Sequence, residues 1–101
     1  MTIEIKKTGN ETVIEVVGRL DTTTAPALDK TIAENTENTT SLVLDMNGLE
    51  YISSAGLRVL LTAQKKMNQI GTMKVINVCE EVMDVFEMTG FADILTIEKK
   101  K

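Results

Sequence analysis

Two consecutive serines, Ser53 and Ser54, stand where a β-branched apolar run gives way to a helical pattern. The sequence there reads YISSAGLRVLL, and its apolar residues recur at the i, i+3 and i+4 spacing of an amphipathic helix. Serine is a favoured N-cap, so either hydroxyl is expected beside the unpaired amides of the first turn. A phosphate on that hydroxyl would meet those amides and the positive end of the helix dipole. The junction is therefore structurally tolerant of serine phosphorylation.

The helix that begins at these serines is predicted to run from Ser54 to Ile70 and to stop at Gly71. Gly56 in its first turn permits a close approach of the backbone, either to a partner or to a neighbouring strand inside the domain. The face expected toward the core carries Leu57, Leu60, Leu61, Ala63, Met67 and Ile70.

A second polar group, Asp21 to Thr24, precedes another predicted helix. Its three threonines are candidate caps, and Pro26 suits a first helical turn. From the residues alone, Asp21 is a cap or turn residue. The expected buried stripe of this helix consists of Ala25, Leu28 and Ile32.

Alternating segments predict a β-hairpin of Thr2–Lys7 and Glu11–Val17, after which Gly18 leaves the sheet. Ser41–Leu44 is almost continuously apolar, which indicates a strand covered on both faces. We expect Asp45–Ile52 to be a connection, with Gly48 in a turn. The residues expected to anchor that connection inward are Leu49, Tyr51 and Ile52.

The carboxyl-terminal part predicts a strand at Met73–Val78, a helix at Glu80–Met88 closed by Gly90, and a last strand at Ile94–Ile97. Strands that alternate with helices favour an α/β domain. The predicted fold is therefore a mixed, largely parallel sheet of four or five strands with an N-terminal hairpin, packed against three or four helices. One domain is expected to span residues 1–101.

Composition narrows the function further. The chain has no histidine and a single cysteine, Cys79, so neither a Ser-His pair nor a tetrahedral zinc cluster is expected. No GxxxxGK[ST] or GxGxxG loop occurs, and the sequence indicates no cofactor. A net charge of −4 argues against direct nucleic-acid binding. The lone cysteine, the absence of a leader and the absence of a long apolar run predict a cytoplasmic protein without membrane insertion.

The run LVLDMNGLEYISSAGLRVLL resembles the signature of the STAS domain (sulfate transporter and anti-sigma factor antagonist), in particular that of stand-alone bacterial anti-sigma factor antagonists. Three further stretches agree in order and spacing: VVGRLDTTTAPAL, GTMKVINV and VFEMTGFADILTI. The resemblance covers nearly the whole chain.

This resemblance implies roles for the polar groups described above. In similar proteins the phosphorylated serine precedes a small residue, glycine and leucine, which here gives Ser54 in Ser54-Ala55-Gly56-Leu57. Most of them carry aspartate just before that serine, whereas this chain has Ser53, which makes Ser53 an alternative acceptor. The implied partner-binding residues are Asp21, Thr22, Ser53, Ser54, Ala55 and Gly56.

The function implied is that of a binding switch, not an enzyme. Unphosphorylated, the protein would hold an anti-sigma factor that is also a serine protein kinase and so free a sigma factor. That kinase would phosphorylate it, and a serine phosphatase would reset it. The alternative is a STAS scaffold or accessory subunit of a signalling or lipid-transport complex, without phosphorylation. A serine hydrolase is a third hypothesis, but this chain lacks a histidine and a Gly-x-Ser-x-Gly elbow.

Overall fold

A computed structural model describes residues 1–100 and contains one five-stranded sheet in the order β1-β2-β3-β4-β5. Strands β1 (Thr2–Thr8) and β2 (Glu11–Leu20) form the predicted antiparallel hairpin, and the other neighbouring pairs are parallel. The expected α/β class and mixed, largely parallel sheet are therefore confirmed. The remaining elements are α1 (Ala25–Asn35), β3 (Ser41–Ile52), α2 (Ser54–Ile70), β4 (Thr72–Val78), α3 (Glu80–Thr89), the 3₁₀ helix η1 (Phe91–Asp93) and β5 (Ile97–Lys99).

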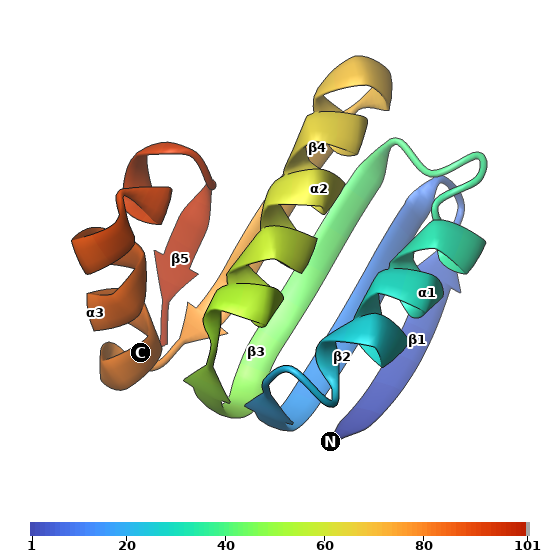
Figure 1. The fold of residues 1–101 in the computed structure, drawn as a ribbon. Coiled ribbons are helices and arrows are strands. Elements are labelled where there is room, and N and C mark those ends of the chain that lie inside the picture. The colour runs from blue at the N-terminus through green and yellow to red at the C-terminus, as the bar shows by residue number, and fades with distance from the viewer. Residues whose placement is uncertain (101) are drawn as a thin grey trace.

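The three α-helices lie on one face of the sheet, and the opposite face is open (Figure 1). Parallel crossovers are almost always right-handed, so a strand order that advances steadily in one direction places every crossover helix on the same side. The side chains of each strand therefore alternate between the covered face and the open face. In β3 the buried residues include Leu42, Leu44 and Met46, whereas Val43 and Asp45 are only partly buried. The expectation that residues 41–44 are covered on both faces was wrong. Among residues 1–100, none of the helices combines the length and the apolar character that a membrane span requires.

Strands β2 and β3 extend further than the sequence predicts, to Leu20 and Ile52. Residues 45–52 therefore continue β3 instead of forming a connection, and Gly18 does not end β2. Two register shifts, between Glu15 and Val17 and between Gly18 and Arg19, each place an extra residue in β3 and so break the regular alternation that identifies a strand there. Gly48 lies within the strand, where a Cβ atom would come within 2.9 Å of a Val17 methyl group.

Two further expectations need correction. Leu49 and Ile52 are buried as predicted, but Tyr51 is 41% exposed because it points to the open face of the sheet. The last strand is β5 at Ile97–Lys99 and not Ile94–Ile97, because η1 and the turn after it occupy the preceding residues.

Helix α2 has the predicted bounds, and its side chains pack on the sheet as the 3.6-residue period requires. Leu57, Leu60 and Met67 are buried, whereas Ile70 in the last turn is 44% exposed, contrary to expectation. At the carboxyl end the Gly71 N–H donates to the Met67 carbonyl. A Cβ atom on Gly71 would collide with the backbone of Thr40, so glycine is required there for packing.

Replacing Leu60 with alanine tests this orientation of α2. Leu60 is fully buried, so we expect Leu60→Ala to lower the free energy of unfolding by about 2 to 5 kcal/mol. Ile70→Ala, on the same helix but with an exposed side chain, is the matched control and should change it by less than about 1 kcal/mol. Urea unfolding of both variants checks the prediction, and equal losses would contradict the placement of the helix.

Candidate functional site

The serine pair and the Asp21 loop leave the sheet side by side. Leu20 and Ile52, the last residues of β2 and β3, are register partners, and the Ser53 N–H donates to the Leu20 carbonyl at 2.9 Å. Both connections thus begin at the carboxyl end of the same strand pair, and both lead into helices on the same face (Figure 1). Two polar groups more than 30 residues apart in the sequence therefore form one surface.

Ser53 is the N-cap of α2. Its backbone is extended (φ −98°, ψ 176°), and its Oγ accepts the Gly56 N–H at 3.4 Å. An N-cap side chain of this kind satisfies one of the amides that have no partner within the helix. The Ser53 hydroxyl therefore has a structural task at the start of α2.

Ser54 is the first helical residue, and its side chain is exposed. No hydrogen bond to its hydroxyl is found within residues 1–100, so a kinase could reach this oxygen without displacing a structural contact. A phosphate at this first position would lie close to the positive end of the α2 dipole. Of the two serines, Ser54 has the geometry of a phosphate acceptor, and Ser53 has that of a helix cap.

The two residues after Ser54, Ala55 and Gly56, face the interior of the domain. Ala55 is partly buried and Gly56 is buried. A Cβ atom on Gly56 would lie 2.7 Å from Leu20 Cγ and 2.9 Å from Ile52 Cγ1, so glycine lets α2 rest on the ends of β2 and β3. Of the two interpretations of Gly56, the structure supports close packing inside the domain. A contribution of Gly56 to partner binding stays a prediction.

Asp21 organises the turn before α1. Its Oδ1 accepts the Thr23 N–H at 3.0 Å, the Thr23 hydroxyl at 2.8 Å and the Thr24 N–H at 3.1 Å. The Thr23 hydroxyl, together with the backbone N–H groups of Thr24 and Thr23, outweighs desolvation and lowers the pKa of Asp21 below its ordinary value of 3.8. The cap-or-turn interpretation of Asp21 is thus confirmed, and its role in partner binding stays a prediction. Thr22, between them, is exposed.

One pair at this end of the sheet was not predicted from the sequence. The Arg19 guanidinium lies 4.2 Å from the centre of the Tyr51 ring, and the two residues are register partners in β2 and β3. Both immediately precede the buried pair Leu20 and Ile52, so strand alternation places them on the open face. The same alternation could have identified them if β3 had been recognised as continuing to Ile52.

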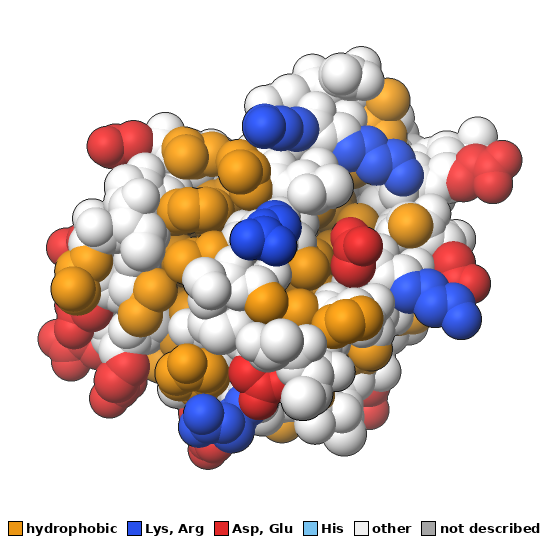
Figure 2. All heavy atoms as spheres, viewed as in Figure 1, with side chains coloured by type: hydrophobic (Ala, Val, Ile, Leu, Met, Phe, Trp, Pro, Cys, Tyr) orange, Lys and Arg blue, Asp and Glu red, His pale blue; other side chains and the backbone are white. Residues whose placement is uncertain are grey.

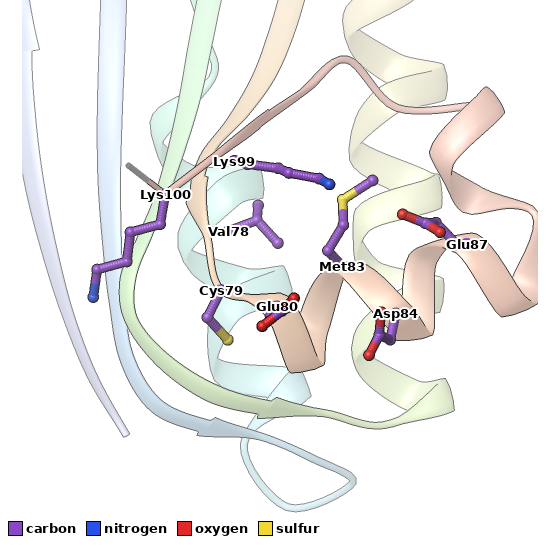
Figure 3. Close-up of a pocket in the computed structure, with 8 residues that line it drawn as sticks. All are labelled: Val78, Cys79, Glu80, Met83, Asp84, Glu87, Lys99 and Lys100. Atoms are coloured by element: carbon purple, nitrogen blue, oxygen red, sulfur yellow. The ribbon is translucent and has the colours of Figure 1, made fainter.

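A surface pocket of about 400 Å³ lies beside the start of α3 (Figure 3). Lys99 extends toward Met83 across it, whereas Lys100 points away from Met83. Carboxylates and ammonium groups both line it, and none of the site residues predicted from the sequence does. Its lining residues are Val78, Cys79, Glu80, Met83, Asp84, Glu87, Lys99 and Lys100. In the described residues, no group of three His, Cys, Asp or Glu side chains is placed to hold a metal ion.

Comparison with known proteins agrees with this architecture. The sequence model of the STAS domain matches residues 2–101. The anti-sigma-B factor antagonist of Bacillus subtilis is 27% identical over 99 residues, which cover 97% of this chain and 91% of that protein.

Two solved structures share the fold. An anti-sigma factor antagonist from Mycobacterium paratuberculosis has a TM-score of 0.86 at 24% identity and covers 96% of this chain and 84% of its own. The anti-sigma factor antagonist SpoIIAA in its unphosphorylated form has a TM-score of 0.82 at 18% identity. The match covers 95% of this chain and 87% of the SpoIIAA chain.

The different roles of the two serines predict different effects on stability. Ser53→Ala removes the cap and should lower the free energy of unfolding by about 1 kcal/mol, whereas Ser53→Asp restores an acceptor and should largely preserve it. Ser54→Ala is the matched control, since no structural contact is removed, and it should stay within about 0.5 kcal/mol of the unchanged protein. Urea unfolding measures all three. A larger loss for Ser54→Ala than for Ser53→Ala would reverse the assignment.

The lowered pKa of Asp21 predicts a pH dependence. Its ionised form is favoured in the folded state, so this contribution is fully present above its unfolded pKa and is lost as the pH falls through the folded value. The difference in unfolding free energy between the unchanged protein and Asp21→Asn should therefore be constant near neutral pH. It should shrink as the pH falls below about 4, where the unfolded carboxyl group begins to take up its proton. A difference that grows on acidification would contradict the hydrogen-bond assignment; denaturant titrations at each pH measure it.

Proposed function

The chain belongs to the STAS domain family, and we propose that it is an anti-sigma factor antagonist whose binding is switched by phosphorylation of Ser54. In the unphosphorylated form it binds an anti-sigma factor and thereby frees a sigma factor. The observation that carries the proposal is the division of labour at the junction, where Ser53 caps α2 and Ser54 offers an exposed hydroxyl at its first position.

The proposed contact surface consists of the serine junction and the Asp21 loop. These lie at the carboxyl ends of adjacent strands, and hydrogen bonds within each connection fix their positions. A surface that is ordered before binding avoids part of the entropy loss of association. The proposed partner is an anti-sigma factor that is also a serine protein kinase, so that one docking event serves both capture and phosphorylation. In this arrangement the chain is a substrate and not an enzyme.

The phosphate acts through the interface. It adds roughly −1.5 to −2 charges at neutral pH. In an interface that means desolvation and repulsion from acidic groups of the partner, which together oppose binding. In the free domain the same phosphate is compatible with the amides and dipole at the start of α2. Phosphorylation thus weakens the complex without unfolding the protein, and a serine phosphatase restores binding.

The setting that suits these partners is the cytoplasm. Regulation is indirect, because the chain acts on an anti-sigma factor and needs no contact of its own with nucleic acid.

Mass spectrometry of the protein purified from its native cells tests the proposal. We expect one phosphate on Ser54, which is absent from Ser54→Ala and retained in Ser53→Ala, the matched control at the neighbouring hydroxyl. A phosphate that disappears only in Ser53→Ala would move the acceptor to Ser53. Ser54→Ala should bind an anti-sigma factor, and Ser54→Asp should bind it roughly tenfold or more weakly.

The absence of phosphate under several growth conditions, together with equal binding by the Ala and Asp forms, would overturn the switch. A stable complex with a signalling or transport assembly would then favour the scaffold function.

A further inference from the structure

The open face of the sheet carries an unusual surface next to the serine junction. This chain has one tyrosine and two phenylalanines and lacks tryptophan, yet its tyrosine is 41% exposed. The Arg19 guanidinium covers the ring at 4.2 Å. Figure 2 views the molecule from the helix side, and at the end where β2 and β3 finish it shows basic, acidic and hydrophobic side chains next to one another. Arginine and tyrosine are the residue types enriched in the centres of protein interfaces.

Val17 enlarges this surface. It lies two residues before Arg19 on β2, so both side chains point to the open face, and it is 37% exposed. Its register partner is Gly48, where any Cβ atom would come within 2.9 Å of a Val17 methyl group. The glycine lets Val17 lie flat against β3. Together, Val17, Arg19 and Tyr51 form what we call the Tyr51 patch.

Arg19 has no salt-bridge partner among residues 1–100. The one salt bridge found in the described residues joins Lys74 to Glu98, so Arg19 contributes to none. A guanidinium that is held over an aromatic ring is positioned in advance, and its planar donors suit a carboxylate. The patch therefore offers an apolar floor with one fixed cation, which is complementary to an apolar side chain beside an acidic one.

We propose that the Tyr51 patch is the second half of the docking surface for the anti-sigma factor, which places a carboxylate on Arg19 and an apolar side chain over Val17 and Tyr51. This inference rests on the proposed function and adds to it the chemistry of the partner. It also assigns a binding role to three strand residues outside the serine and Asp21 loops.

The position of the patch explains why the same partner reaches it. Tyr51 precedes Ser54 by three residues, or about 10 Å of extended chain. A standard interface covers about 800 Å² on each protein, which is roughly 30 Å across. A partner that covers Ser54 at the end of the sheet is therefore large enough to reach Arg19 and Tyr51 as well.

The test measures affinity for the anti-sigma factor that the unphosphorylated protein captures from its native cells and that is identified by its sequence. We expect Arg19→Ala and Tyr51→Ala each to weaken binding about tenfold or more, with the double variant losing less than the product because the two side chains act together. Arg19→Ala should also reduce the dependence of the association rate on ionic strength, which a merely structural change would leave intact. Thermal melts establish that both variants are folded.

Matched controls come from the same chain. Lys6→Ala removes a cation at the other end of the open face, and Ile70→Ala removes an exposed apolar side chain at the far end of α2. Both should bind like the unchanged protein. The inference is overturned, with the proposed function intact, if the Tyr51 patch variants bind within about twofold of the unchanged protein, or if Lys6→Ala loses as much as Arg19→Ala. Failure of the unchanged protein to bind any anti-sigma factor would overturn both.

Discussion

The parallel pairing of β2 with β3 is the constraint on which the rest of this structure depends. Its last register pair, Leu20 and Ile52, is buried, and the Ser53 N–H extends the ladder by one more bond to the Leu20 carbonyl. That bond fixes where β3 ends, and so where α2 begins. Gly56 then lets the helix rest directly on the two strand ends. The positions of the serines, the Asp21 loop and the Arg19–Tyr51 pair all follow from this single alignment.

Local chemistry made the helices and the serine junction predictable. The period of α2, the proline at the start of α1 and the acidic first turn of α3 are each encoded within a few residues. The choice between Ser53 and Ser54 as the cap was not predictable in this way. It depends on where β3 stops, and that is set by a hydrogen bond to a residue more than 30 positions earlier.

The errors have a related origin. Residues 45–52 contain a glycine and polar residues that suggest a turn, yet the partner strand β2 holds them in the sheet through two register shifts. Pairing between strands distant in sequence overrides local preference in such cases. Tyr51 was expected to point inward for the same reason, because residues 45–52 were assigned to a connection and not to a strand, in which Tyr51 and the buried Ile52 point to opposite faces. The open face of the sheet also could not be predicted from any single strand. It results from the placement of all three helices on the other face, which depends on the order of the strands.

The neutral cap has a consequence for the proposed switch. A charged aspartate at the cap would partly neutralise the positive end of the helix and would repel a phosphate on the next residue. Ser53 supplies the hydrogen bond without the charge, so the amino end of α2 keeps its full attraction for an anion at Ser54. Because the Ser54 side chain is exposed and contributes nothing to the core, its charge can change while packing beneath it does not. Ser53 thus contributes to stability, and the adjacent Ser54 to switching. A phosphate on Ser54 therefore affects the binding of a partner more than it affects the fold.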